Sequence, residues 1–160
     1  MLTQIKFLSL IPIICFTLLS CGSTAQTKKE KTKAKTAAKT MQSDIVSVSY
    51  KHTVGRGGFS NIEITQDLVT TESAGGMFTN YPKVNRKTTV DEWNKLISLI
   101  NIPTLENIKS GEGQGHYDGP DEFITIKTKT KEINILNASN AQITSIKEQL
   151  NKIVGAPVQK

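Results

Sequence analysis

The sequence predicts an α+β fold, a single antiparallel sheet of five or six strands with two helices packed on one face. Segments of alternating apolar and polar residues come in pairs joined by short turns, which is typical of β-hairpins. Two other segments repeat apolar residues at helical spacing. Strands grouped in hairpins, with one helix in the middle and one at the end, favour an antiparallel sheet covered by helices.

The first strands are recognised by their alternation. Residues 45–54 place apolar side chains on one face and Ser, Thr and Lys on the other, as a half-buried strand does. Gly55-Arg56-Gly57-Gly58 predicts a turn. Ile62 and Ile64 of the return strand are expected to face the core. The strands expected in this part are residues 45–54, 59–66, 68–72 and 83–88. The apolar face of the first strand consists of Val46, Val48, Tyr50, His52 and Val54.

The first helix has a clear N-terminal signal. Thr89 and Glu92 form a capping box, in which each side chain accepts a hydrogen bond from the other residue's backbone N–H. An apolar stripe follows, and Pro103 is expected to end the helix. Leu105 and Ile108 are expected to attach the next segment to the core. The stripe consists of Trp93, Leu96, Ile97 and Ile100.

A second hairpin and a C-terminal helix complete the predicted fold. Residues 123–128 and 133–136 alternate on either side of a short polar turn. Ser139 and Gln142 form another candidate capping box, and Gly155 is expected to end the helix. The uncovered sheet face is expected to carry Ser, Thr, Lys and Asn, which suits a binding module. The stripe of this helix consists of Ile143, Ile146, Leu150 and Ile153.

The N-terminus has the pattern of a secretory signal peptide. Lys6 precedes an apolar run at residues 7–19. As a helix this run would be about 20 Å long, whereas the hydrocarbon core of a bilayer is about 30 Å thick. The run therefore suits the apolar region of a signal peptide. A buried helix or an uncleaved anchor is the alternative, although no stop-transfer pattern follows.

The run ends in Leu18-Leu19-Ser20-Cys21, which resembles the lipobox of bacterial lipoproteins. The resemblance implies that residues 1–20 are removed and that Cys21 becomes an acylated N-terminus holding the protein on a membrane. Cys15 would leave with the signal peptide, so cysteine catalysis is excluded for the mature chain. In enteric lipoproteins, an Asp directly after the cysteine retains the protein in the inner membrane. Gly22 stands at that position here, so the resemblance implies the outer membrane. The following residues lack an acidic patch, which favours the periplasmic side.

Positive charge is concentrated in residues 22–43, which carry six Lys and one Glu. From residue 44 to the C-terminus, 13 basic and 13 acidic residues balance, so the overall charge of +6 does not indicate nucleic-acid binding. Residues 21–43 are expected to be the lipidated cysteine and a disordered tether, 44–155 the folded domain and 156–160 a tail. The tether lysines either lie on anionic lipid or cell-wall polymer, or simply keep the spacer extended.

One loop, residues 111–122, combines four glycines with a histidine and four acids. It does not fit a phosphate-binding loop, because neither a helix nor a Lys-Ser/Thr pair follows. Asp118, Asp121 and Glu122 are hard oxygen ligands that would suit calcium, but their spacing is not that of an EF-hand. No metal or other cofactor is expected.

The same loop permits a catalytic interpretation. His116 next to Asp118 would act as a general base oriented by a carboxylate. Against this, an ordinary exposed loop would have Tyr117 packed inward and a turn leading into the next strand. His52, on the apolar face of the first strand, is interpreted as a satisfied core or edge residue rather than a ligand. A zinc site would need His52 and His116 to meet beside a carboxylate.

The order of elements over residues 44–154 resembles that of small lipoproteins from Bacteroidetes-type bacteria. The resemblance carries over no activity and no catalytic residues. We therefore expect a membrane-anchored envelope lipoprotein that is a non-enzymatic binding or structural module, with an envelope protein, peptide or glycan as partner. The alternative is an envelope hydrolase or metal-dependent enzyme that uses His116, Asp118 and Asp121. Possible binding residues are His116, Tyr117, Asp118, Asp121 and Glu122.

Overall fold

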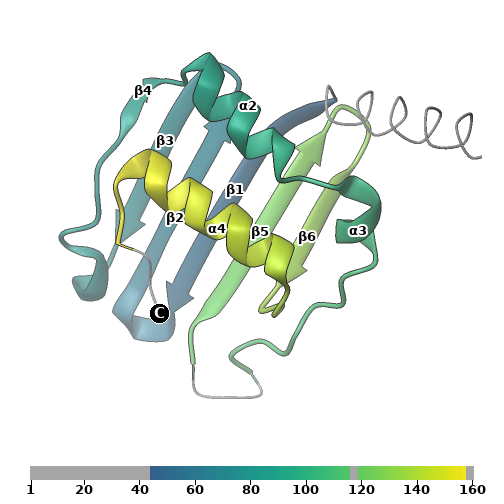
Figure 1. The fold of residues 1–160 in the computed structure, drawn as a ribbon. Coiled ribbons are helices and arrows are strands. Elements are labelled where there is room, and N and C mark those ends of the chain that lie inside the picture. Colours follow the sequence, from purple (N-terminus) through teal and green to yellow (C-terminus); the bar gives the residue numbers. More distant parts are fainter. Residues whose placement is uncertain (1–43, 116–118, 158–160) are drawn as a thin grey trace, which may run out of the picture. The chain divides into compact units, whose positions relative to one another are not determined.

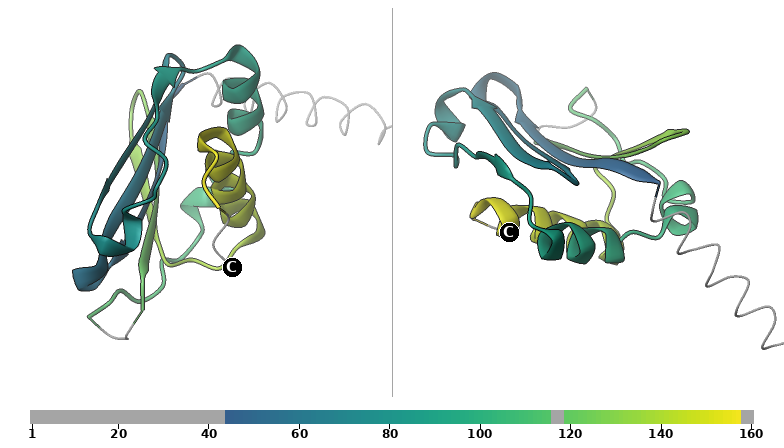
Figure 2. Two further views of the ribbon diagram at one scale, coloured as in Figure 1. Left: turned by 90° about the vertical axis from the view of Figure 1, so that its left-hand side faces the viewer. Right: turned by 90° about the horizontal axis from the view of Figure 1, so that it is seen from above.

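The computed structural model describes residues 44–115 and 119–157. These residues form a six-stranded antiparallel sheet in the order β4-β3-β2-β1-β5-β6, with two helices on one face, as predicted (Figures 1 and 2). The strands are β1 (Ile45–Val54), β2 (Gly58–Thr65), β3 (Leu68–Ala74), β4 (Asn85–Lys87), β5 (Asp121–Thr128) and β6 (Glu132–Leu136). The helices are α2 (Val90–Ser98), α3 (Ile102–Glu106) and α4 (Ala141–Val154), with the short 3₁₀ turns η1 (Gly55–Gly57) and η2 (Gly76–Phe78).

The core lies between the sheet and the helices α2 and α4 (Figure 2). Buried apolar side chains come from both helices and from every strand except the short β4, as the periodicity predicted. Ala156, just beyond α4, also belongs to this core. The most deeply buried side chains are Val48, Ile62, Ile64, Val69, Leu96, Ile100, Leu105, Ile124, Ile126, Ile146 and Leu150.

The alternation predicted for β1 is wrong at its first residues. Ile45 pairs with Thr128 and Ser47 pairs with Lys127, so the register shifts by a bulge between them. The bulge turns Ile45 into the core and leaves Val46 41% exposed. An extra residue in one strand reverses which side chains face inward, because strand side chains alternate with a period of two.

The capping box of Thr89 and Glu92 at the start of α2 is confirmed. Pro103, by contrast, does not end that helix, which already stops at Ser98; the proline lies in the first turn of α3. The first turn of a helix has no intrahelical acceptor for its N–H groups, so a residue without an N–H fits there. Leu105 of α3 is buried as expected.

The N-cap of the C-terminal helix lies one residue later than predicted. Asn140, not Ser139, is the N-cap residue, and its side-chain oxygen accepts from the Gln142 backbone N–H at 2.8 Å. Both residue types cap helices well, so the sequence alone did not distinguish them. Gly155 ends α4 in the left-handed conformation with φ of 70°, as predicted.

Two loops at one end of the sheet touch backbone to backbone through glycines. Gly58 and Gly75 have φ values of +110° and +95°. A Cβ on Gly58 would lie 1.9 Å from the Ala74 carbonyl oxygen, and one on Gly75 would lie 2.4 Å from that of Gly57. Glycine is therefore required at both positions by conformation and by space.

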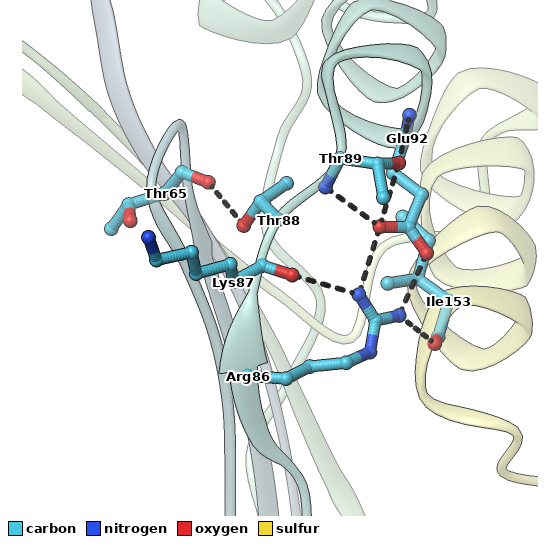
Figure 3. A network of polar contacts seen from close by, with 7 residues as sticks. All are labelled: Thr65, Arg86, Lys87, Thr88, Thr89, Glu92 and Ile153. Carbon is cyan, nitrogen blue, oxygen red and sulfur yellow. Dashed lines mark hydrogen bonds and ion pairs between the residues drawn. The ribbon is translucent and has the colours of Figure 1, made fainter.

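An arginine joins β4 to both covering helices (Figure 3). The Arg86 guanidinium donates to the two carboxylate oxygens of Glu92 at 2.9 and 2.7 Å and to the Ile153 carbonyl at 3.0 Å. Glu92 also accepts from the backbone N–H of Thr89 at 3.0 Å. Mainly through the Arg86 hydrogen bonds, the pKa of Glu92 is lowered to about 2. We call this group the Arg86 junction: Arg86, Thr89, Glu92 and Ile153.

Candidate functional site

The described helices leave one face of the sheet uncovered, and its centre carries a lysine beside two aromatic rings. Lys51 of β1 lies directly opposite Phe123 of β5 in the strand register. Its ammonium nitrogen lies 5.3 Å from the ring centroid of Phe59 on β2. Lys51 is exposed, whereas both rings are half-buried among polar neighbours. We call this the open face; its central polar residues are Ser49, Lys51, Thr53, Asn61, Glu63, Thr125 and Asn134.

The two edge strands of the sheet are short. β4 is only three residues long. Along β6, the Leu136 carbonyl accepts from the Gly111 N–H at 2.7 Å, and the Leu136 N–H donates to the Ser110 hydroxyl at 3.1 Å. Strand addition pairs a peptide with a run of edge backbone groups, and two short edge strands, one of them already bonded at Leu136, leave only a short run for it. A ligand of this sheet is therefore better placed on its open face than on an edge.

Of the five possible binding residues in the predicted loop, His116, Tyr117 and Asp118 lie outside the described residues. Asp121 and Glu122 are consecutive in β5, so their side chains leave on opposite faces of the sheet. One Asp121 carboxylate oxygen accepts from the Gln114 N–H at 3.0 Å and from the Asn137 side-chain amide at 2.8 Å. Asp121 thus fastens the loop to the β6–α4 connection, and over residues 44–115 and 119–157 no cluster of three metal-ligating side chains occurs.

Glu122 lies at the centre of a polar cluster between the sheet and α4. One carboxylate oxygen accepts from the Tyr50 hydroxyl and the other from the Lys147 ammonium group, both at 2.6 Å. Burial alone raises the pKa of Glu122, but the hydrogen bonds from Lys147 and Tyr50 outweigh it and hold the pKa below its ordinary value. Burial, followed by the bond to Glu122, raises the pKa of Tyr50. The carboxylate is therefore ionised and the phenol neutral at neutral pH.

His52 completes this cluster, which we call the Glu122 junction: Tyr50, His52, Glu122 and Lys147. It pairs with Glu122 across the β1–β5 ladder and meets the Phe78 ring edge-on, with ring centroids 5.5 Å apart. Only 6% of His52 is exposed, and its Nδ1 atom has no hydrogen-bond partner. His52 is thus a core residue, as expected, but not a satisfied one. Burial lowers its pKa, an effect that Glu122 opposes and Lys147 reinforces.

An open depression of about 390 Å³ adjoins the Glu122–Lys147 pair. The Asn137 side chain in its wall is already engaged: it accepts from the Glu122 N–H at 2.7 Å and donates to the Glu112 carbonyl at 2.6 Å. A ligand here would compete with these Asn137 contacts and with the Glu122–Lys147 pair. The depression is lined by Pro120, Glu122, Asn137, Ala138, Ser139, Thr144 and Lys147.

Sequence reasoning did not identify Lys147, Tyr50 or Phe123 as members of either group. Lys147 and Glu122 are 25 residues apart, and only the packing of α4 on β5 brings them together. One signal was available for Lys147: it directly follows Ile146 of the apolar stripe, so its side chain leaves at the margin of the buried face. For Phe123, an aromatic residue on the outward face of a predicted strand was such a signal.

Comparisons with protein-family models, with curated proteins and with solved structures found no match for this chain. In the part of the chain that the structure describes, none of the helices has the length and apolar character needed to cross a bilayer. Cys21 lies outside the described residues.

Proposed function

We propose that this chain is a membrane-anchored envelope lipoprotein whose folded domain is a non-enzymatic binding module, with the open face as its binding surface. The observation that supports this most is the placement of Lys51 beside Phe59 and Phe123 on a sheet face that the described helices leave uncovered. Two half-buried rings on a face of polar residues are more apolar surface than an outward strand face needs.

The anchor rests on the lipobox-like run that ends in Cys21. Each buried acyl CH₂ group contributes about 0.8 kcal/mol, and a single myristoyl chain binds a membrane only marginally. A diacylglyceryl group together with an N-acyl chain would hold the protein permanently. With Gly22 after the cysteine, we place the anchor in the outer membrane, with the domain facing the periplasm.

We propose a glycan of the envelope as the ligand. Sugar rings offer flat apolar C–H faces that pack on aromatic rings, and hydroxyl groups that bond to Asn, Glu, Ser and Thr side chains. The open face provides both kinds of group side by side. A peptide bound by strand addition is less suitable, because β4 has three residues and β6 has five, with Leu136 already bonded to Ser110 and Gly111.

Binding is tested by sedimenting the full detergent-solubilised chain with purified insoluble peptidoglycan. The double variant Phe59→Leu/Phe123→Leu keeps the apolar surface but removes the rings, and we expect its binding to weaken about tenfold. Leu68→Ala, on the same face but on β3, is the matched control and should bind as the wild type does. Equal sedimentation of the double variant and the wild type would refute the open face as the glycan surface.

The anchor is tested separately by mass spectrometry of protein taken from its native membrane. We expect a chain that begins at Cys21 and carries three acyl chains, and we expect Cys21→Ser to leave the membrane fraction. An intact leader on the wild-type protein would refute the lipoprotein assignment without bearing on the glycan experiment.

A further inference from the structure

The Glu122 junction contains one cation and one buried base that face the same carboxylate. Lys147 on α4 donates to Glu122 at 2.6 Å, and Tyr50 on β1 occupies the other oxygen. His52, next but one to Tyr50 on the same strand face, lies opposite Glu122 and has no partner for Nδ1. A buried nitrogen without a partner is uncommon in folded proteins, because it loses its hydrogen bonds to water and gains none.

The groups around His52 come from β1, β2, β5, α4 and η2. Tyr50 faces it from its own strand, Glu122 from β5 and Lys147 from α4. From the other side, η2 contributes the Phe78 ring, against which Tyr81 packs edge-on. On β2 the opposite residue is Ser60. Glu122 and Lys147 are therefore the charged groups that act on the imidazole within the described residues.

We propose that His52 is a proton-operated release for α4: when its buried ring is protonated, it takes over the Glu122 carboxylate and Lys147 moves into solvent. The protonated ring would leave two cations beside one carboxylate, and a buried excess charge is costly. Of the two cations, the Lys147 side chain is already 24% exposed and has a flexible stem, whereas His52 is nearly enclosed.

The release would loosen α4 at one position of its buried face. Lys147 contributes the ion pair with Glu122 and a second contact, with its ammonium nitrogen 5.9 Å from the Tyr50 ring centroid. Both contacts join α4 to the sheet, and both are lost together when Lys147 leaves. Its neighbours Ile146 and Leu150 stay buried, so we expect local opening of the helix rather than unfolding of the domain.

The pH range of the release follows from burial. Because burial lowers the pKa of His52 below its ordinary value of 6.5, the ring is neutral at neutral pH and becomes charged only in a more acidic medium. Opening that requires one proton changes by at most about tenfold per pH unit.

Hydrogen exchange of the full chain between pH 7.5 and pH 5.0, corrected for the intrinsic rate, tests this proposal. We expect exchange of the amides of α4 (residues 141–154) to rise as the pH falls, by up to about tenfold per unit below pH 6.5. The amides of β1 and β2 should keep their protection. An equal increase throughout the domain, or none in α4, would overturn the proposal.

Variants assign the effect to its residues. His52→Asn, which has no titratable ring, should remove the acid response of α4, whereas His116→Asn, at the only other histidine, should retain it. In Lys147→Met the competing cation is gone, so the pKa of His52 measured by NMR should rise above the wild-type value. An unchanged pKa in Lys147→Met, or a persistent acid response in His52→Asn, would contradict the release.

Discussion

The two polar junctions that hold helices on the sheet differ in how completely they are paired. In the Arg86 junction, the guanidinium donates to the Glu92 carboxylate and to the Ile153 carbonyl near the end of α4 (Figure 3). The same carboxylate accepts from the Thr89 N–H at the start of α2. In the Glu122 junction, each carboxylate oxygen also has a partner, but the neighbouring His52 Nδ1 atom has none. The same interaction type therefore yields one junction that is stable over a wide pH range and one that changes with mild acid.

The largest effect is expected at the backbone contact between Gly58 and Gly75. This contact lies beside the Glu122 junction, since η2, which follows Gly75, supplies the Phe78 ring that packs on His52. Gly58→Ala places a methyl group against a backbone oxygen at a positive φ, so we expect a loss of about 3 kcal/mol in the free energy of unfolding. Gly76→Ala is the control, since a Cβ there meets nothing within 4 Å. Urea denaturation measures both, and equal stabilities would contradict the contact.

The next effect concerns the Arg86 junction. Arg86→Met removes the bidentate bond to Glu92 and the bond to the Ile153 carbonyl, and should cost about 2 kcal/mol in urea denaturation. Arg86→Lys keeps the positive charge but cannot form the bidentate bond, so its loss in the free energy of unfolding should be smaller than that of Arg86→Met. Arg56→Met, at an exposed residue of η1, should change little. A loss in Arg56→Met as large as that in Arg86→Met would show that general charge, not this geometry, matters.

The pH dependence of stability should separate the two junctions. The pKa of His52 is lowered in the folded protein, so protonation of the unfolded chain destabilises the fold as the pH falls below 6.5, by up to about 1.4 kcal/mol per unit. The stabilisation by Glu92 is present above its ordinary pKa of 4.5 and is lost as the pH falls through about 2. In thermal melts over a range of pH, His52→Asn should lack the loss of stability that begins below pH 6.5. Arg86→Met should have a smaller loss of stability between about pH 4.5 and pH 2.

The smallest effect is expected at an ion pair outside both junctions. Lys129 and Asp44 lie 3.3 Å apart, but their side chains are 65% and 44% exposed. Solvent and salt screen such a pair, so Lys129→Ala should change the free energy of unfolding by less than about 0.5 kcal/mol. If Lys129→Ala lowered the free energy of unfolding as much as Arg86→Met, solvent exposure would not explain why the Lys129–Asp44 pair is weaker than the Arg86–Glu92 pair.

The parts of the fold that depend on local chemistry were predictable from the sequence. The capping box at Thr89, the stripe of α4 and the stop at Gly155 involve residues within one or two turns of each other. The bulge at Val46 was not predictable, because it arises from pairing with β5, which lies about 80 residues away in the chain. Pro103 is compatible with both the end and the start of a helix, and its neighbours decided between them.

The candidate surfaces show the same division. Alternation placed Lys51 on the outward face and His52 on the inward face of the first strand, and both placements are correct. The ring of Phe59 beside Lys51, and Lys147 beside Glu122, depend on strand register and helix packing across long sequence separations. Single-sequence patterns carry no information on such pairs, so the sequence indicated the faces but not their partners.

The short edge strands have a consequence for crowding. A protein anchored by lipid, as proposed, is confined to two dimensions and meets copies of itself far more often than a freely diffusing one. Sheets with long bare borders polymerise under those conditions by adding strands from neighbouring molecules. One edge strand has three residues and the other has five, with Leu136 bonded to Ser110 and Gly111, so neighbouring copies find only short stretches of backbone to extend, and strand addition between copies should be weak.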